Sequence, residues 1–193
     1  IQSRQDRWGN VRRRQGKEVS AYGIARLAQK ANAPLALIFG AGKVGRGFLA
    51  DILFNSGWRV RFVDTSEVVI EELNKMGGHI ITRLSTPQSH QRIRHQGATL
   101  LGSEQVNQWI NEADLIFTAL GGNNLEAWCS KVKPLVENRI QSRPLDIILC
   151  ENHHAPAQLV KQALDIESPN LGIIQSQILR SCIEPTKQQL NDF

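Results

Sequence analysis

The chain has 193 residues, of which 41% are hydrophobic and 21% are charged, and its formal net charge is +5. These values are ordinary for a soluble globular protein, and the length suffices for one domain with a substantial core. No apolar run approaches the roughly 20 residues of a membrane-spanning helix, so we expect no membrane partner.

The positive charge is concentrated at the start of the chain. Residues 1–30 contain eight basic and two acidic residues, so the remaining 163 residues carry a net charge of −1. This distribution argues against nucleic acid as a partner of the main domain. Residues 1–33 form a basic leader, with a possible helix from Ser20 to Lys30, that could contact RNA, an anionic surface or a protein. The alternative, which we favour, is a solvated leader without a binding role.

The three cysteines predict a reducing compartment. Cys129, Cys150 and Cys182 are odd in number, lack C-x-x-C spacing and lie in apolar surroundings. The first residues are polar and basic, without the apolar segment of a secretory signal. We therefore expect reduced core thiols in a cytoplasmic protein.

The first chemical motif follows a short apolar run at residues 36–39, which predicts a buried strand. Gly40, Gly42 and Gly45 match G-x-G-x-x-G, and the residues after Gly45 have helical periodicity as far as about Asn55. Gly40 would allow a tight turn, Gly42 the close approach of a pyrophosphate, and Gly45 the packing of helix against strand. The helix N-terminus would offer free N–H groups to the phosphates. The residues expected to bind them are Gly40, Ala41, Gly42, Lys43, Val44, Gly45 and Arg46.

A second strand, predicted for residues 58–63, leads to Asp64, nineteen positions after Gly45. An acidic side chain at this distance can accept hydrogen bonds from a ribose 2′-OH. A carboxylate would also repel a 2′-phosphate, which favours NAD over NADP. The alternative for the whole motif is a glycine-rich loop with nothing bound.

The next segment predicts a helix from Ser66 to about Met76 and a possible strand from His79 to Leu84. Residues 85–102 are polar without a clear period, so we expect a loop there, followed by a helix over residues 103–111. His90 and His95 are expected to be exposed loop residues rather than metal ligands, because no third ligand has suitable spacing. We predict no metal site.

Residues 113–120 form a second continuous apolar run, typical of a buried parallel strand. Its end forms a loop of small residues, and ligands of doubly wound sheets lie outside the carboxyl ends of the strands. We therefore expect Thr118, Ala119, Leu120 and Gly121 to border the cofactor's ribose or nicotinamide. The alternative is a simple strand-to-helix turn.

A helix over residues 124–141 and a strand over 145–150 precede Glu151, Asn152, His153 and His154. Asn152 is the candidate for positioning the nicotinamide or the substrate, and at least one of the two histidines is expected to be solvated. A helix over residues 156–165 and a strand over 171–176 complete the pattern. The alternation predicts an α/β fold, a doubly wound, mostly parallel Rossmann-type sheet with helices on both faces.

These residues together resemble a known family. The stretch Gly40–Phe48, the loop Thr118–Gly121, the sequence Cys150-Glu151-Asn152, and Ser176 and Arg180 look like the N-terminal domain of the mannitol-1-phosphate 5-dehydrogenase and mannitol dehydrogenase family, the polyol-specific long-chain dehydrogenases. The resemblance covers about residues 35–185. It implies reversible, NAD-dependent hydride transfer between a polyol, which is phosphorylated in some members, and the corresponding keto sugar.

The resemblance also implies roles for single residues. Residues 40–45 would hold the pyrophosphate, Asp64 the adenosine ribose, and residues 118–121 the nicotinamide ribose, with Asn152 at the substrate end. The family's catalytic lysine, followed by an asparagine and a histidine, comes from a helical C-terminal domain that this chain does not contain. We accordingly expect a leader at 1–33, a dinucleotide-binding domain at 34–185 and a tail at 186–193 that leads to that domain.

Three hypotheses follow. The chain is the NAD-binding domain of a polyol or polyol-phosphate dehydrogenase, inactive by itself, with a sugar or sugar phosphate bound through the absent domain. Alternatively, it is a non-catalytic NAD-binding sensor or interaction module whose arm recruits a partner. Thirdly, it is an enzyme of the same fold that borrows its general base from a partner subunit.

Overall fold

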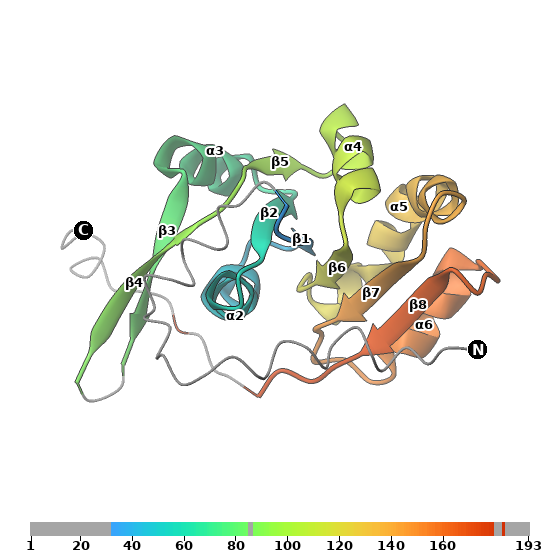
Figure 1. Cartoon of the computed structure of the whole chain (residues 1–193). Coiled ribbons are helices and arrows are strands. Elements are labelled where there is room, and N and C mark those ends of the chain that lie inside the picture. Colours follow the sequence, from blue (N-terminus) through green and yellow to red (C-terminus); the bar gives the residue numbers. More distant parts are fainter. Residues whose placement is uncertain (1–31, 85–86, 180–182, 184–193) are drawn as a thin grey trace, which may run out of the picture.

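The computed structural model describes residues 32–84, 87–179 and 183, and its centre is a six-stranded parallel sheet (Figure 1). The strand order is β5-β2-β1-β6-β7-β8, which confirms the doubly wound α/β prediction. The strands of this sheet are β1 (Leu35–Phe39), β2 (Arg59–Asp64), β5 (Ala98–Leu100), β6 (Leu115–Thr118), β7 (Leu145–Leu149) and β8 (Leu171–Gln175). The order reverses between β1 and β6, and a sheet of this kind binds ligands at that reversal.

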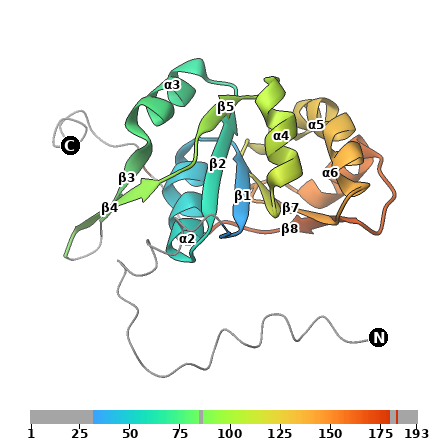
Figure 2. The same ribbon diagram turned by 45° about the horizontal axis from the view of Figure 1, so that its top comes forward.

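Helices cover both faces of the sheet, as expected. Those of one face are α4 (Glu104–Glu112), α5 (Leu125–Ile140) and α6 (Pro156–Leu164), and those of the other are the π-helical turn η3 (Gly45–Leu49), α2 (Ala50–Asn55) and α3 (Glu67–Met76). In Figure 2, α4, α5 and α6 lie together, apart from α2 and α3. Each group buries one apolar core against the sheet. All five residues of β1 are buried because the strand is covered on both faces.

The expectation of a loop over residues 85–102 is wrong. Half of this segment lies in β4 (Ser89–Arg94), which pairs antiparallel with β3 (Gly78–Arg83), and in β5. The hairpin β3–β4 extends beside α2 and α3 (Figure 1). Only Ile93 of β4 is buried, so the strand shows no apolar alternation, and β5 has three residues, too few to show a period.

His90 and His95 each meet half of the expectation of exposed loop residues: His90 is exposed but not in a loop, and His95 lies in the link between β4 and β5 but is not exposed. His90 lies within β4, and His95 is half-buried with its ring 5.5 Å from that of Phe62. Within the described ranges, no group of three or more histidine, cysteine, aspartate or glutamate side chains could hold a metal ion.

At the amino ends of the strands, Arg139 near the end of α5 and Arg143 in the turn between α5 and β7 bind backbone carbonyls. The buried Arg139 donates to the carbonyls of Ile110, Ala113 and Arg143 at 2.6–3.2 Å. Arg143 donates to three carbonyls at the end of α4 and to the Asp114 carboxylate. Guanidinium groups thus satisfy the free carbonyls at the C-terminus of α4 and fix it against β6.

Residues 1–31 of the predicted leader, with its helix, the tail 186–193, Arg180 and Cys182 lie outside the described residues. Cys129 and Cys150 are buried free thiols, and burial raises the pKa of Cys129 to about 11. Among the described residues, no helix is long and apolar enough to cross a membrane.

Candidate functional site

The loops that follow β1 and β6 meet at the point where the strand order reverses. Gly40 has a φ of +99°, and a Cβ atom there would lie 2.2 Å from the carbonyl oxygen of Ala119. The Ala119 amide donates to the carbonyl of Phe39 at 2.8 Å. Only glycine allows both this backbone conformation and this approach. Gly40 therefore joins the two loops.

The second and third glycines of the motif have opposite surroundings. A Cβ on Gly45 would lie 1.9 Å from the carbonyl oxygen of Gly40, so this glycine permits the helix to pack on the turn, as predicted. A Cβ on Gly42 would have no protein atom within 4 Å. The protein's own packing thus does not require glycine at position 42, and the open space beside it is where a ligand's pyrophosphate would fit.

The helix after the glycine turn begins with the π-helical turn η3 rather than a regular α-helix. The Nε2 atom of His79, in β3, lies 2.9 Å from the carbonyl oxygen of Arg46. Because a carbonyl only accepts, this nitrogen carries the hydrogen. Burial lowers the pKa of His79 to about 4, so the ring is neutral near pH 7. The hairpin β3–β4 thereby holds the turn from one side.

Asp64, at the end of β2, is bound by three backbone amides. Its Oδ2 accepts from Ala41 at 2.6 Å, and its Oδ1 accepts from Thr65 and Ser66 at 2.7 and 2.9 Å. A carboxylate offers about four acceptor sites, so capacity for a further donor is left. The carboxylate is consequently fixed against the glycine turn before any ligand arrives.

Glu151, directly after β7, binds the backbone of the loop after β6, as Asp64 binds the glycine turn. Its side chain is buried, with 4% of the residue exposed. Oε1 accepts from the Leu120 amide at 2.8 Å and Oε2 from the Gly121 amide at 2.9 Å. Glu151 was named from the sequence as part of the motif Cys150-Glu151-Asn152, but no contact was assigned to its side chain.

A pocket of about 290 Å³ lies between these loops and α5. Of the predicted residues, Gly40, Gly42, Asp64, Ala119 and Leu120 line it. The sequence prediction missed the other lining residues, which are Val63, Thr65, Leu101, Asn124, Ala127, Trp128 and Lys131. Four of these recur at helical spacing from 124 to 131, and that period after the small-residue loop was the available signal.

The remaining predicted residues lie outside the pocket lining. Ala41, Gly45 and Thr118 are buried beneath it, Lys43 is exposed, Val44 and Arg46 are half-buried in the helix start, and Gly121 is bound to Glu151. The Thr118 hydroxyl is buried without a hydrogen-bond partner among the described residues.

Asn152 is exposed and does not line the pocket. His153 and His154 beside it are exposed as well, in agreement with the solvated alternative, and the His153 ring covers Gly122. The structure brings Glu151 to the loop after β6 and leaves Asn152 in solvent. Its role at the substrate end stays a prediction.

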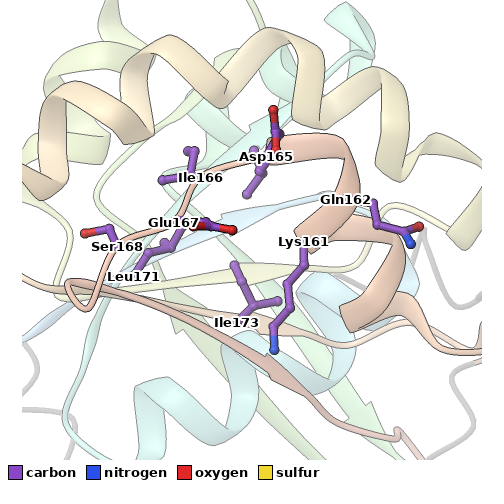
Figure 3. Close-up of a pocket in the computed structure, with 9 residues that line it drawn as sticks. Lys161, Gln162, Asp165, Ile166, Glu167, Ser168, Leu171 and Ile173 are labelled. Atoms are coloured by element: carbon purple, nitrogen blue, oxygen red, sulfur yellow. The ribbon is translucent and has the colours of Figure 1, made fainter.

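A larger hollow of about 470 Å³ lies at the opposite edge, beside the turn from α6 to β8 (Figure 3). Lys161, Asp165, Glu167 and Ser168 contribute polar groups to its lining. None of the predicted site residues belongs to this hollow. Size alone would favour it, but the convergence of glycines, fixed carboxylates and strand ends identifies the smaller pocket as the candidate site.

Comparison with known proteins agrees with this geometry. The sequence model described as the mannitol dehydrogenase Rossmann domain matches residues 34–178. Mannitol-1-phosphate 5-dehydrogenase of Clostridium acetobutylicum is 35% identical over 132 residues, which cover 67% of this chain and 34% of that protein. The corresponding enzyme of Enterococcus faecalis is 37% identical over 124 residues, covering 61% and 32%. The chain spans about a third of the length of these relatives.

Solved structures share the fold at low sequence identity. Octopine dehydrogenase in complex with NADH and agmatine superposes with a TM-score of 0.56 at 12% identity, covering 76% of this chain and 40% of that one. Glycerol-3-phosphate dehydrogenase of Coxiella burnetii has a TM-score of 0.50 at 11% identity, covering 75% and 54%. These likenesses concern the fold of the domain.

Proposed function

The chain belongs to the mannitol dehydrogenase family through its Rossmann domain, and from this premise we propose that it is the NAD-binding domain of a dehydrogenase that acts on a polyol or polyol phosphate. The reaction would be hydride transfer of the mannitol-1-phosphate/fructose-6-phosphate type. The observation that carries the proposal is the pocket at the β1–β6 reversal, with open space at Gly42 and a fixed carboxylate at Asp64.

The residues present fit a dinucleotide. The start of the helix after Gly42 would hold the pyrophosphate through free backbone amides, with Lys43 and Arg46 adding positive charge nearby. In the pocket between the loops, Asp64 and Leu101 would contact the adenosine half, and Ala119 and Leu120 would lie toward the nicotinamide half. Bound there, the cofactor would accept or supply the hydride.

The choice of NAD over NADP rests on Asp64. Its carboxylate is already ordered by the amides of Ala41, Thr65 and Ser66, so little conformational freedom would be lost when a ribose hydroxyl binds. A 2′-phosphate would bring two negative groups together, which is unfavourable by Coulomb repulsion. We therefore propose NAD(H) as the cofactor.

We place the remaining machinery, the general base and any group that binds a substrate phosphate, in a further helical domain, as the family resemblance implies. Support comes from the relatives, which are about twice as long as this chain and match it over only about a third of their own length. A cytoplasmic location is proposed on the free buried thiols of Cys129 and Cys150.

Exchange of Asp64 for asparagine tests the cofactor proposal. Asp64→Asn removes the charge at nearly constant size and should weaken NADH binding by about 1–3 kcal/mol, the scale of a charged hydrogen bond. The affinity for NADPH should fall by less than this or should rise. Isothermal titration calorimetry measures both ligands. Asp165→Asn, an exposed site at the other edge of the sheet, is the matched control. Unchanged NADH affinity in Asp64→Asn would refute the assigned role.

The reaction itself is tested with the protein in its full natural length. When NAD and mannitol 1-phosphate are supplied, the protein should produce NADH, and the absorbance of NADH measures the rate. Binding of NADH without turnover of any polyol or polyol phosphate would favour the non-catalytic alternative.

A further inference from the structure

We propose that Glu151 is a positioning residue that sets the conformation of the loop Thr118–Gly121, and through this loop the affinity for the nicotinamide half of the dinucleotide. The inference rests on the proposed function and gives a specific contact to Glu151, which was named from the sequence only as part of the motif Cys150-Glu151-Asn152.

The carboxylate is buried and its hydrogen bonds go to backbone amides. Each of its two oxygens accepts one hydrogen bond, from the consecutive amides of Leu120 and Gly121, at 2.8 and 2.9 Å. Among the residues that the structure describes, no basic side chain forms an ion pair with it. Burial of a charge is costly unless donors compensate it, and charge-assisted bonds are the stronger kind. The two amides therefore supply the compensation, and their orientation is coupled to the presence of the charge.

The loop is held from its other side as well. The side-chain amide of Asn124 donates to the Leu120 carbonyl at 2.7 Å, so both polar groups of this residue are fixed. Gly121 has a φ of +80°, a conformation that glycine adopts without strain. The preceding Ala119 carbonyl lies against Gly40. A change at Glu151 would thus reach the pocket through Leu120 and the glycine turn.

The position in the sheet decides which half of the ligand is affected. A dinucleotide lies across the reversal point, with one mononucleotide over each half of the sheet. Asp64 follows β2, on the same side of the reversal as β5, whereas Glu151 and the loop follow β7 and β6 on the other side. Asp64 would contact the adenosine half. The Glu151-bound loop, whose Ala119 and Leu120 line the same pocket from the other half of the sheet, would then contact the nicotinamide half.

The isosteric variant Glu151→Gln isolates the charge. Glutamine has one acceptor oxygen, so its NH2 group would face an amide N–H and one hydrogen bond would be lost. Calorimetry with NADH and NMR titration with ADP compare the whole ligand with its adenosine diphosphate part. We expect NADH to bind about tenfold more weakly or worse, and ADP to bind within about twofold of wild type. The matched control Glu167→Gln, at an exposed glutamate beside the hollow of Figure 3, should leave both unchanged.

The outcomes separate the inference from the proposed function. Wild-type protein that does not bind NADH refutes both. Wild type that binds NADH, together with a Glu151→Gln variant of equal affinity, refutes only the inference. Equal losses for NADH and ADP also refute it, because the effect would then not be confined to the nicotinamide half.

A measurement on the wild-type protein is independent of how the variant folds. In ¹H–¹⁵N NMR spectra, the Leu120 and Gly121 amide signals should move when NADH is added and stay nearly in place with ADP. If NADH leaves both signals unmoved while other signals of the pocket shift, the proposed role of Glu151 is wrong.

Discussion

The parallel sheet has an amino edge, where its strands begin, and a carboxyl edge, where they end, and side chains of opposite charge stabilise the two edges. At the carboxyl edge, the carboxylates of Asp64 and Glu151 accept hydrogen bonds from loop amides. At the amino edge, the guanidinium groups of Arg139 and Arg143 donate to carbonyls where α4 ends. In a doubly wound fold the helices begin at the first edge and end at the second, so free amides face one and free carbonyls the other.

This difference separates binding from stability. The carboxyl-edge loops surround an open pocket, and their ordered polar groups preorganise it for a ligand. The amino-edge contacts leave no space for a ligand at Arg139, because this side chain is buried and its partners are backbone groups of neighbouring elements. We expect substitutions at the first edge to change affinity and substitutions at the second to change the free energy of unfolding.

Gly42→Val would produce the largest effect at the carboxyl edge. The added side chain has no protein atom within 4 Å of its Cβ, so the melting temperature should stay close to that of wild type. It would occupy the space where the pyrophosphate approaches, so calorimetry should detect no NADH binding. Retained affinity would place the ligand elsewhere, and a large loss of thermal stability would show that the space beside Gly42 is not open.

Arg139→Met is the corresponding change at the amino edge. It leaves the carbonyls of Ile110 and Arg143 without this donor, whereas the Ala113 carbonyl still accepts from Arg143. We expect the free energy of unfolding to fall by up to about 3 kcal/mol, the scale for lost hydrogen bonds to a charged group. Urea unfolding measures this loss. NADH affinity at a temperature where the variant is folded should remain unchanged, and a matching loss of affinity would contradict the division between the edges.

Acid should lower the free energy of unfolding through His79, because a charged imidazolium is unfavourable in its buried position beside the glycine turn. The pKa of His79 is lowered by burial to about 4, so the folded protein binds fewer protons than the unfolded chain between about pH 6.5 and 4. The stability from the neutral ring is complete above this window and is lost as the pH falls through it, by about 3 kcal/mol at 1.36 kcal/mol per pKa unit. His95, whose pKa burial also lowers, acts in the same direction.

His79→Gln keeps a side-chain donor and removes the titrating ring, so urea unfolding of this variant between pH 7 and 4 should show a smaller decrease than wild type. An identical pH dependence in both proteins would exclude His79 as a source of the acid sensitivity.

The sequence predicted the carboxyl edge well where its signals are local. The apolar run of β1, the three glycines and Asp64 lie within about 30 residues, and each has a type-specific reason to be there. The hairpin strand β4 was missed because its stability comes from backbone pairing with β3 and one buried side chain, Ile93. Neither leaves a hydrophobic period.

The role of Glu151 was out of reach for a different reason. Its partners are backbone amides about 30 positions earlier in the chain, and backbone groups carry no residue-specific signal. The same holds for Arg139, which the sequence presents as one more charged residue near the end of a helix. Long-range contacts between a side chain and the backbone become visible only in the folded structure.

The central claim is that the carboxyl edge is a site for NAD(H), selected by Asp64. Calorimetric titration of the wild-type protein with NADH and NADPH under identical conditions tests it most directly. We predict one NADH per chain, bound more tightly than NADPH. No detectable binding of NADH, or tighter binding of NADPH, would contradict the assignment.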